Sequence, residues 1–224
     1  MLENEIRPLN TKLDARIASL KDLSRLISRI DDFIESNCPA CESNNKNHKF
    51  IKNGLSYSSC VKCDTFFMDP RPSEDILEWF YKDSENYKYW NEHIFPQTDI
   101  VRKKKIFTPR VDKLIHYLDK YNITSNSLLE IGCAFGTFLE LVINTGKFDR
   151  VTGVEPTPGL AATCRSKGIE VIEDTVENII LEKKEKYSVV ANFEVLEHLG
   201  NPTSFIKKCR SFLKPDGILI FTCP

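Results

Sequence analysis

The chain has 224 residues, with 31 Lys and Arg against 32 Asp and Glu and a formal net charge of -1 at pH 7. This length suits one full-sized domain with a small appendage and excludes a large multidomain assembly. The balanced charge gives no general attraction to polyphosphate or anionic lipid, and 41% hydrophobic residues exclude a chain that is disordered throughout.

The N-terminus MLENEIRPLN lacks the basic and apolar regions of a signal peptide, and no apolar run approaches the roughly 20 residues of a membrane span. We therefore expect a cytoplasmic protein with no membrane contact. In that reducing compartment, closely paired cysteines more often hold a metal than form disulfides.

A heptad pattern of aliphatic residues runs through residues 2–36. One seam has five residues spaced seven apart, and a second lies between them: Ile6, Leu13, Leu20, Ile27 and Ile34, with Leu2, Leu9, Leu23 and Ile30. The pattern predicts one amphipathic or coiled-coil helix over residues 1–37, which forms a homodimer or binds a partner protein. The apolar Ile17, Leu26 and Phe33 beside the seam equally suit a helix that packs on its own core.

Two C-x2-C pairs follow, Cys38 with Cys41 and Cys60 with Cys63, separated by eighteen residues. This spacing predicts a zinc ribbon over residues 38–72, with the four thiolates around one tetrahedral Zn2+. Asn53-Gly54 indicates a two-residue hairpin turn between the pairs. With four protein ligands the ion has no open position, so we expect a structural metal; His48 is a weaker candidate ligand.

Residues 73–126 are predicted to form a helical linker and cofactor lid. Ser73 is placed to cap a helix that continues to about Tyr81, and a second helix is expected from about Asp99 to Tyr121. Six basic residues crowd the start of that second helix: Arg102, Lys103, Lys104, Lys105, Arg110 and Lys113. They suit either RNA or phosphate binding or a solvated helix face.

From residue 127 onward, short apolar runs alternate with helical segments. The five predicted strands cover residues 127–131, 150–154, 168–172, 187–191 and 217–221. Such alternation predicts an α/β fold with a Rossmann-like, doubly wound, mostly parallel sheet over residues 127–224. Ligands of these sheets bind beyond the carboxyl ends of the strands, so the residues there are the candidates for function.

Four of the predicted strands end in residues with binding or catalytic chemistry. The first leads into Gly132-Cys-Ala-Phe-Gly136, a small-residue turn that lets a ligand approach the backbone. Glu155 follows the second strand, where a carboxylate can accept both ribose hydroxyls. Asp174 and Thr175 follow the third strand and suit an adenine edge, and Asn192 begins the sequence NFEVLEHL after the fourth.

Together these segments resemble the class I S-adenosylmethionine-dependent methyltransferases over residues 128–224. LLEIGCAFGTFLE is similar to the family's first motif, VTGVEP to its ribose-binding segment, EDTVENI to its adenine segment, and NFEVLEHL and FLKPDGILIFTCP to its fourth and fifth strands. The resemblance implies that S-adenosylmethionine is bound through its methionine part by Glu130, Gly132 and Gly136, through ribose by Glu155, through adenine by Asp174 and Thr175, and at its amino end by Asn192. Ala134 stands at the family's usual middle glycine, where a methyl group costs little only at negative φ.

The cysteine pairs followed by FMDPRPS resemble the N-termini of bacterial zinc-ribbon methyltransferases, among them sugar-modifying enzymes. This implies methyl transfer to a small-molecule or sugar acceptor, with His198 or Glu194 as the candidate base. Glu194, Glu197 and His198 equally suit a role in orienting the next helix. The alternatives are an RNA methyltransferase that reads RNA through the ribbon, which the charge disfavours, and an inactive scaffold. Because the family's sheet continues past a fifth strand, we also expect a C-terminally truncated chain.

Overall fold

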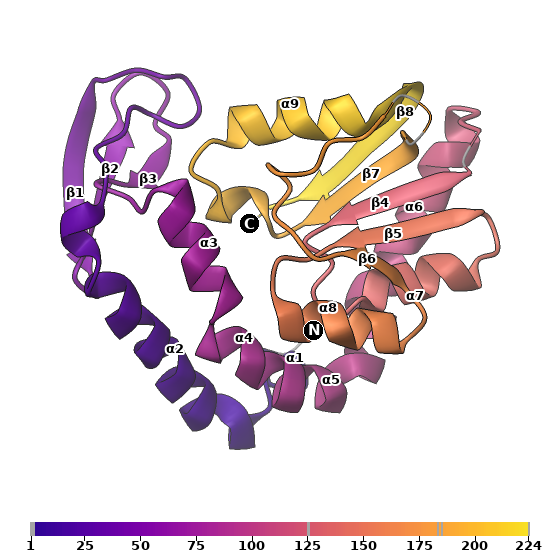
Figure 1. Cartoon of the computed structure of the whole chain (residues 1–224), viewed down its shortest axis with the longest axis horizontal. Helices are drawn as coiled ribbons and strands as arrows, with labels where there is room; N and C mark the ends of the chain where they lie inside the picture. The colour runs from indigo at the N-terminus through magenta and orange to yellow at the C-terminus, as the bar shows by residue number, and fades with distance from the viewer. Residues whose placement is uncertain (1–2, 125, 183, 185, 224) are drawn as a thin grey trace.

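The computed structural model describes residues 3–124, 126–182, 184 and 186–223, and Leu2 of the predicted seam lies outside them. Figure 1 shows three parts: an N-terminal helical arm, a small antiparallel sheet at the upper left, and a larger sheet with helices on both faces. Within the described residues, no helix is both long and apolar enough to cross a membrane.

The N-terminal arm is not the single helix predicted over residues 1–37. It consists of short helical pieces: α1 (Glu3–Ile6), the 3-10 turn η1 (Leu9–Thr11), α2 (Lys12–Ile27) and the 3-10 turn η2 (Ile30–Asp32). Pro8, which lacks a backbone N–H, separates α1 from η1. Beyond η2 the chain is extended, and Ile34 forms a β-bridge with Arg71.

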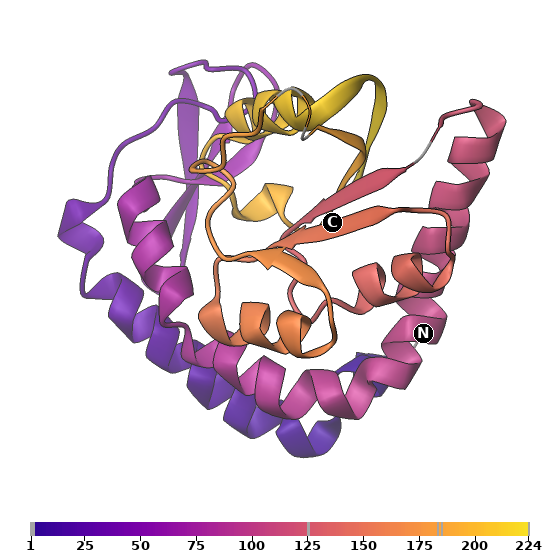
Figure 2. The ribbon, with the colours of Figure 1, turned by 45° about the vertical axis from the view of Figure 1, so that its right-hand side comes forward.

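The face of α2 that packs inside the protein contains only part of the heptad seam, because Leu23 and Ile27 pack with Leu26 against the small sheet and the linker. Its buried residues are Ala18, Asp22 and Leu26, whereas the seam residues Leu13 and Leu20 are exposed. Figures 1 and 2 show α2 beside α4 (Glu85–Tyr89), and a carboxylate decides this docking. Asp22 accepts hydrogen bonds from the Ser84 hydroxyl and from the amides of Glu85 and Asn86, at 2.6 to 2.9 Å. Contact of the exposed seam with another chain stays a prediction.

The small sheet holds the two cysteine pairs. Its antiparallel strands are β1 (Lys46–Lys52), β2 (Leu55–Cys60) and β3 (Phe66–Met68), in that order. Asn53 and Gly54 both have positive φ, +54° and +81°, which confirms the predicted two-residue hairpin turn. Sequence reasoning missed β3, a three-residue strand too short for its alternation to be read.

The linker is almost entirely helical. Ser73 caps α3 as predicted, accepting a hydrogen bond from the Ile76 amide at 3.4 Å. The linker begins with α3 (Glu74–Lys82), which is followed by α4. Beyond α4 it continues as one nearly unbroken helical run with two π-helical turns: η3 (Trp90–Ile94), α5 (Phe95–Arg102), η4 (Lys103–Phe107) and α6 (Thr108–Lys120). Most of its basic residues are paired, since Lys103 contacts Asp99 and Glu140 while Arg102 donates to Thr98 and to the Ile6 carbonyl.

In the described chain, the large sheet has five parallel strands in the order β6-β5-β4-β7-β8. The strands are β4 (Ser127–Ile131), β5 (Arg150–Val154), β6 (Glu170–Ile172), β7 (Tyr187–Phe193) and β8 (Leu213–Thr222), with α7 (Thr137–Asn144), α8 (Pro158–Ser166) and α9 (Pro202–Phe212) between them. This confirms the predicted doubly wound sheet. The strand order reverses between β4 and β7, where such sheets bind ligands.

Each face of the sheet has its own apolar core. Leu128 faces the core that contains α6 and α7, whereas Leu129 and Ile131 face the core that contains α9. This alternation follows from the two-residue period of a strand and explains why the strands read as continuous apolar runs. Glu130 lies on the same face as Leu128 and is 3% exposed, a carboxyl group in an otherwise apolar strand.

Candidate functional site

The loop after β4 reverses tightly against β5 and α8. Gly132 and Gly136 both have φ of +75°, a left-handed conformation that favours glycine. A Cβ atom on Gly132 would lie 2.6 Å from Val195 Cγ2, and one on Gly136 would lie 2.9 Å from the sulfur of Cys164. Both positions therefore require glycine, and the loop presents its backbone at the carboxyl ends of the strands.

Ala134 also has positive φ, +46°. Its methyl group would cost little only at negative φ, and the structure does not have that conformation here. A non-glycine residue in this region costs about 1–2 kcal/mol. A hydrogen bond from the Ala134 amide to Glu155 Oε2, at 2.9 Å, holds the residue in this strained conformation.

Glu155 lies directly beyond β5 and is 5% exposed. Its second oxygen, Oε1, accepts from the Thr157 amide at 2.9 Å, so both oxygens are oriented by backbone donors. Burial raises the pKa of Glu155, and the two amide hydrogen bonds partly oppose this. Since a carboxylate oxygen accepts more than one hydrogen bond, the group keeps capacity for ligand hydroxyls beside the Gly132 loop.

Two buried polar side chains at the switch in strand order, one directed to each face of the sheet, lack partners. Ile131 of β4 is in register with Asn192 of β7, and Glu130 precedes Ile131. Within the described residues, Glu130 Oε2 and both amide atoms of Asn192 are buried without a hydrogen-bond partner. Burial raises the pKa of Glu130 well above its usual range. Unpaired buried polar groups are costly, so they favour a polar ligand in direct contact.

Asp174 and Thr175 follow β6 on the other side of Glu155. Asp174 Oδ1 accepts from its neighbour's amide, Thr175 N, at 2.7 Å and from Asn178 Nδ2 at 2.8 Å. The Thr175 amide, predicted to suit an adenine edge, is thus already engaged locally. The adenine role of this pair stays a prediction.

Glu194, a candidate base, is held in a different network. Its Oε1 accepts from Arg110 Nη2 at 3.0 Å and from the Thr222 hydroxyl at 2.7 Å, which ties β7 to α6 and β8. The Arg110 guanidinium also stacks over Phe193, 4.5 Å from its ring centroid. Sequence reasoning missed Arg110, because nothing in its basic cluster marks one member as buried beside β7.

His198 ends the 3-10 turn η6 (Leu196–His198) after β7. Its side chain is 50% exposed, with Nε2 4.0 Å from Glu197 Oε1. Asn201 caps α9 instead, since its side-chain oxygen accepts from the Ser204 amide at 3.0 Å. Neither Glu194 nor His198 is therefore needed as the N-cap of that helix.

The linker supplies two tyrosines near the same strand ends. Tyr81 of α3 and Tyr87 of α4 have ring centroids 5.7 Å apart. Burial raises the pKa of Tyr81 to about 12, and the nearby charges of Glu155 and Glu197 add to this. Burial raises the pKa of Tyr87 in the same way. Both phenols thus remain protonated donors between Glu155 and the loop after β7, which periodicity could not predict.

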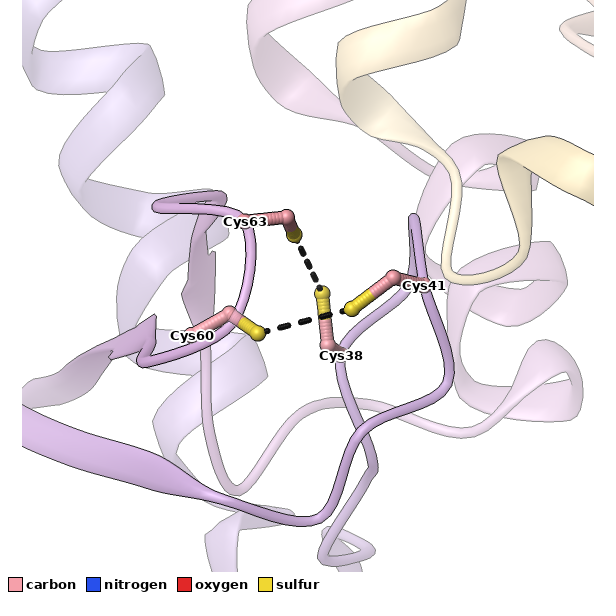
Figure 3. A group of neighbouring side chains, drawn as sticks. All are labelled: Cys38, Cys41, Cys60 and Cys63. Atoms are coloured by element: carbon pink, nitrogen blue, oxygen red, sulfur yellow. Dashed lines mark hydrogen bonds between the residues drawn. The ribbon is translucent and has the colours of Figure 1, made fainter.

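The four cysteines of the two pairs converge as predicted (Figure 3). Their sulfurs all lie within 4.8 Å of one another, with Cys38–Cys63 at 3.6 Å and Cys41–Cys60 at 3.5 Å. Four ligands at about 2.3 Å from a tetrahedral Zn2+ have sulfurs about 3.8 Å apart, so the donor set fits this ion. Hydrogen bonds from the side chain and backbone of Thr65 lower the pKa of Cys63 to about 6, toward the thiolate form that binds metal. His48 lies on β1, outside the cluster.

The two knuckles repeat one backbone pattern. The Cys38 amide donates to Ser43 O and the Glu42 amide to Cys38 O, both at 2.9 Å. In the second knuckle, Cys60 donates to Thr65 O and Asp64 to Cys60 O. Glu42 and Asp64, at matching positions, have φ of +62° and +58°. Both knuckles are thus turned to present two sulfurs to one point.

The sheet order, the glycine-bearing loop after β4 and the acid after β5 together define a class I methyltransferase fold with its site at the strand ends. The profile of the methyltransferase-domain family matches residues 102–224, more than half of the chain. The chain belongs to this family.

Curated relatives are ubiquinone biosynthesis O-methyltransferases. That of Actinobacillus pleuropneumoniae is 33% identical over 105 residues, which cover 42% of this chain and 44% of the relative. That of Proteus mirabilis is 35% identical over 101 residues, covering 42% and 40%. The chain thus spans less than half the length of either relative.

Solved structures with the same fold include two that act on sugars. An amino pentose methyltransferase from Micromonospora echinaspora, solved with S-adenosylmethionine bound, has a TM-score of 0.50 at 20% identity, over 56% of this chain and 54% of that one. A sugar N-methyltransferase from a Streptoalloteichus species has a TM-score of 0.50 at 16% identity, over 56% and 51%. At this identity the likeness shows the fold alone.

Proposed function

We propose that the protein transfers a methyl group from S-adenosylmethionine to a small-molecule acceptor. The observation that carries this is the pair of partnerless buried side chains, Glu130 and Asn192, at the switch in strand order beside a glycine-bearing loop. Family membership points the same way. The sulfonium of S-adenosylmethionine supplies an activated methyl group, so the protein's task is largely placement.

The chain's own residues divide the work of binding. Glu130, Asn192 and the backbone of Gly132, Ala134 and Gly136 would hold the methionine part. Glu155, oriented by two amides, would accept the ribose hydroxyls, and Asp174 with Thr175 would contact adenine. Orphaned acceptors and an amide side chain suit an ammonium and carboxylate pair, which both donates and accepts hydrogen bonds.

We propose His198 as the base for an acceptor hydroxyl, in preference to Glu194. Its imidazole is half exposed after β7, whereas Glu194 is engaged by Arg110 and Thr222. Tyr81 and Tyr87 add two protonated hydroxyls on the opposite wall. Aromatic faces with hydroxyl donors suit a sugar or nucleotide-sugar acceptor, the class implied by the zinc-ribbon resemblance.

For the cysteine cluster we propose a structural Zn2+ held by Cys38, Cys41, Cys60 and Cys63. All four positions of a tetrahedral ion would be filled, so the metal takes no part in methyl transfer. The ribbon packs on the arm and on α3 through Leu55, Leu26 and Ile76, so the metal would hold this N-terminal part of the chain in place.

RNA is the less favoured acceptor. The basic residues that would grip a phosphate backbone are largely committed, with Lys103 paired to Glu140 and Lys105 to Glu5. An inactive scaffold is disfavoured by the unpaired polar groups of the site, which would be a cost without a ligand.

Calorimetry with S-adenosylhomocysteine tests the proposal. We expect the wild type to bind, Glu155→Ala to lose at least about tenfold in affinity, and Glu173→Ala, at an exposed neighbouring acid, to bind like the wild type. A wild type that folds but does not bind the cofactor product would contradict methyl transfer.

A further inference from the structure

Arg71 follows β3 and stands between the zinc ribbon and the loop after β7. Its backbone is fixed by the β-bridge to the arm: the Arg71 amide donates to Ile34 O at 3.0 Å, and the Ile34 amide donates to Arg71 O at 2.9 Å. The position of this residue therefore does not depend on its own side chain. What the side chain contacts is a separate matter.

The Arg71 guanidinium packs against Gly200. A Cβ atom on Gly200 would overlap Nη1 and would lie 2.6 Å from Cζ. Gly200 does not have positive φ, so its backbone conformation would accept alanine. Only the guanidinium therefore requires the space beside it. The absence of a side chain at residue 200 thus makes room for a cation beside the loop.

This cation has no counter-ion among the residues that the structure describes. Arg71 Nε is buried without a hydrogen-bond partner, and no described carboxylate forms an ion pair with the guanidinium. The acid closest to Arg71 in sequence, Asp69, is already paired with Lys46 at 2.5 Å and accepts a hydrogen bond from the Ser36 amide. An unpaired, partly buried guanidinium is costly, which favours an anionic ligand.

The place of Arg71 indicates which ligand the anion belongs to. Gly200 is two residues from His198, so their Cα atoms are at most about 7 Å apart. Of the residues predicted to hold the cofactor, only Asn192 lies on β7, and the others lie on β4 or on the loops after β4, β5 and β6. An anion at Arg71 therefore belongs to the acceptor rather than to the cofactor.

We propose that Arg71 binds a phosphate group of the acceptor, through the planar fork of its guanidinium. This rests on the proposed function and sharpens it: the acceptor is a phosphorylated small molecule such as a nucleotide-activated sugar. Its phosphate lies beside the Arg71 guanidinium, next to the loop around Gly200, and its sugar extends toward His198. A guanidinium presents two parallel N–H donors to phosphate, a geometry that lysine cannot reproduce.

Calorimetry with uridine diphosphate, in the presence of S-adenosylhomocysteine, tests the proposal. We expect the wild type to bind uridine diphosphate, Arg71→Gln to lose at least about tenfold in affinity, and Arg71→Lys to lose less. Gly200→Ala keeps the charge but displaces the guanidinium, so it should weaken binding as well. Arg210→Gln removes an exposed arginine of α9 and should change affinity by less than about twofold.

Binding of S-adenosylhomocysteine, measured separately for each variant, distinguishes the two proposals. A wild type that binds S-adenosylhomocysteine but not uridine diphosphate, or an Arg71→Gln variant that binds uridine diphosphate like the wild type, overturns the phosphate site and leaves methyl transfer standing. Arg71-dependent binding of glucuronate in place of uridine diphosphate overturns it in favour of a carboxylate. If Arg71→Gln does not fold, Arg71→Lys and Gly200→Ala decide the result.

Discussion

The small cysteine-bearing sheet (the ribbon) and the large sheet are held together by different means. Around the cysteine cluster only Cys38, Cys60 and Phe67 form the buried apolar group, whereas each face of the sheet has ten or more buried residues. We therefore expect the ribbon to depend on the proposed metal for folding, whereas the sheet folds by burial. The converse holds for polar groups: the ribbon's donors converge on one point, but the sheet leaves Glu130 and Asn192 unpaired. On the proposed function, a ligand would complete the structure of the ribbon and the function of the sheet.

Removal of the metal is expected to have the largest effect, and to be confined to the ribbon. Cys60→Ser, or a strong chelator, should abolish amide-exchange protection in β1–β3 while the large sheet keeps its protection. Structural zinc contributes about 10–16 kcal/mol in small peptides, more than the ribbon's few apolar contacts can replace. Cys223→Ser, at an exposed cysteine outside the cluster, is the matched control. Unchanged amide-exchange protection of the ribbon without metal would contradict its dependence on a metal for folding.

The arm tests how far the ribbon side depends on single polar contacts. Asp22→Ala should lower the free energy of unfolding by about 3 kcal/mol, because it leaves the buried Ser84 hydroxyl and two amides at the start of α4 without their acceptor. Asp14→Ala, at an exposed acid of the same helix, should cost less than about 0.5 kcal/mol. Urea unfolding measures both. Equal effects of the two substitutions would mean that Asp22 does not dock the arm.

The smallest effect is expected at the loop after β4. Ala134→Gly should raise the free energy of unfolding by about 1 kcal/mol, because it removes the left-handed strain at φ of +46°. Ala162→Gly, in an exposed position of α8, should have the opposite sign, at a cost of about 1 kcal/mol. The same unfolding measurement separates them, and destabilisation by both would show that Ala134 is not strained.

Local signals in the sequence determined the hairpin turn at Asn53-Gly54, the cap at Ser73, the convergence of the four cysteines and the five-stranded sheet. These features depend on spacing, turn chemistry and periodicity within a few residues, which a single chain displays directly. Tertiary structure alone decided the break of the arm into short helices, the burial of Asp22 with only part of the heptad seam, the pairing of Glu194 with Arg110, and the unpaired guanidinium of Arg71 beside Gly200. Each of these joins segments far apart in the chain, and their partners are selected by packing and by the cost of burying charge, which no local pattern encodes.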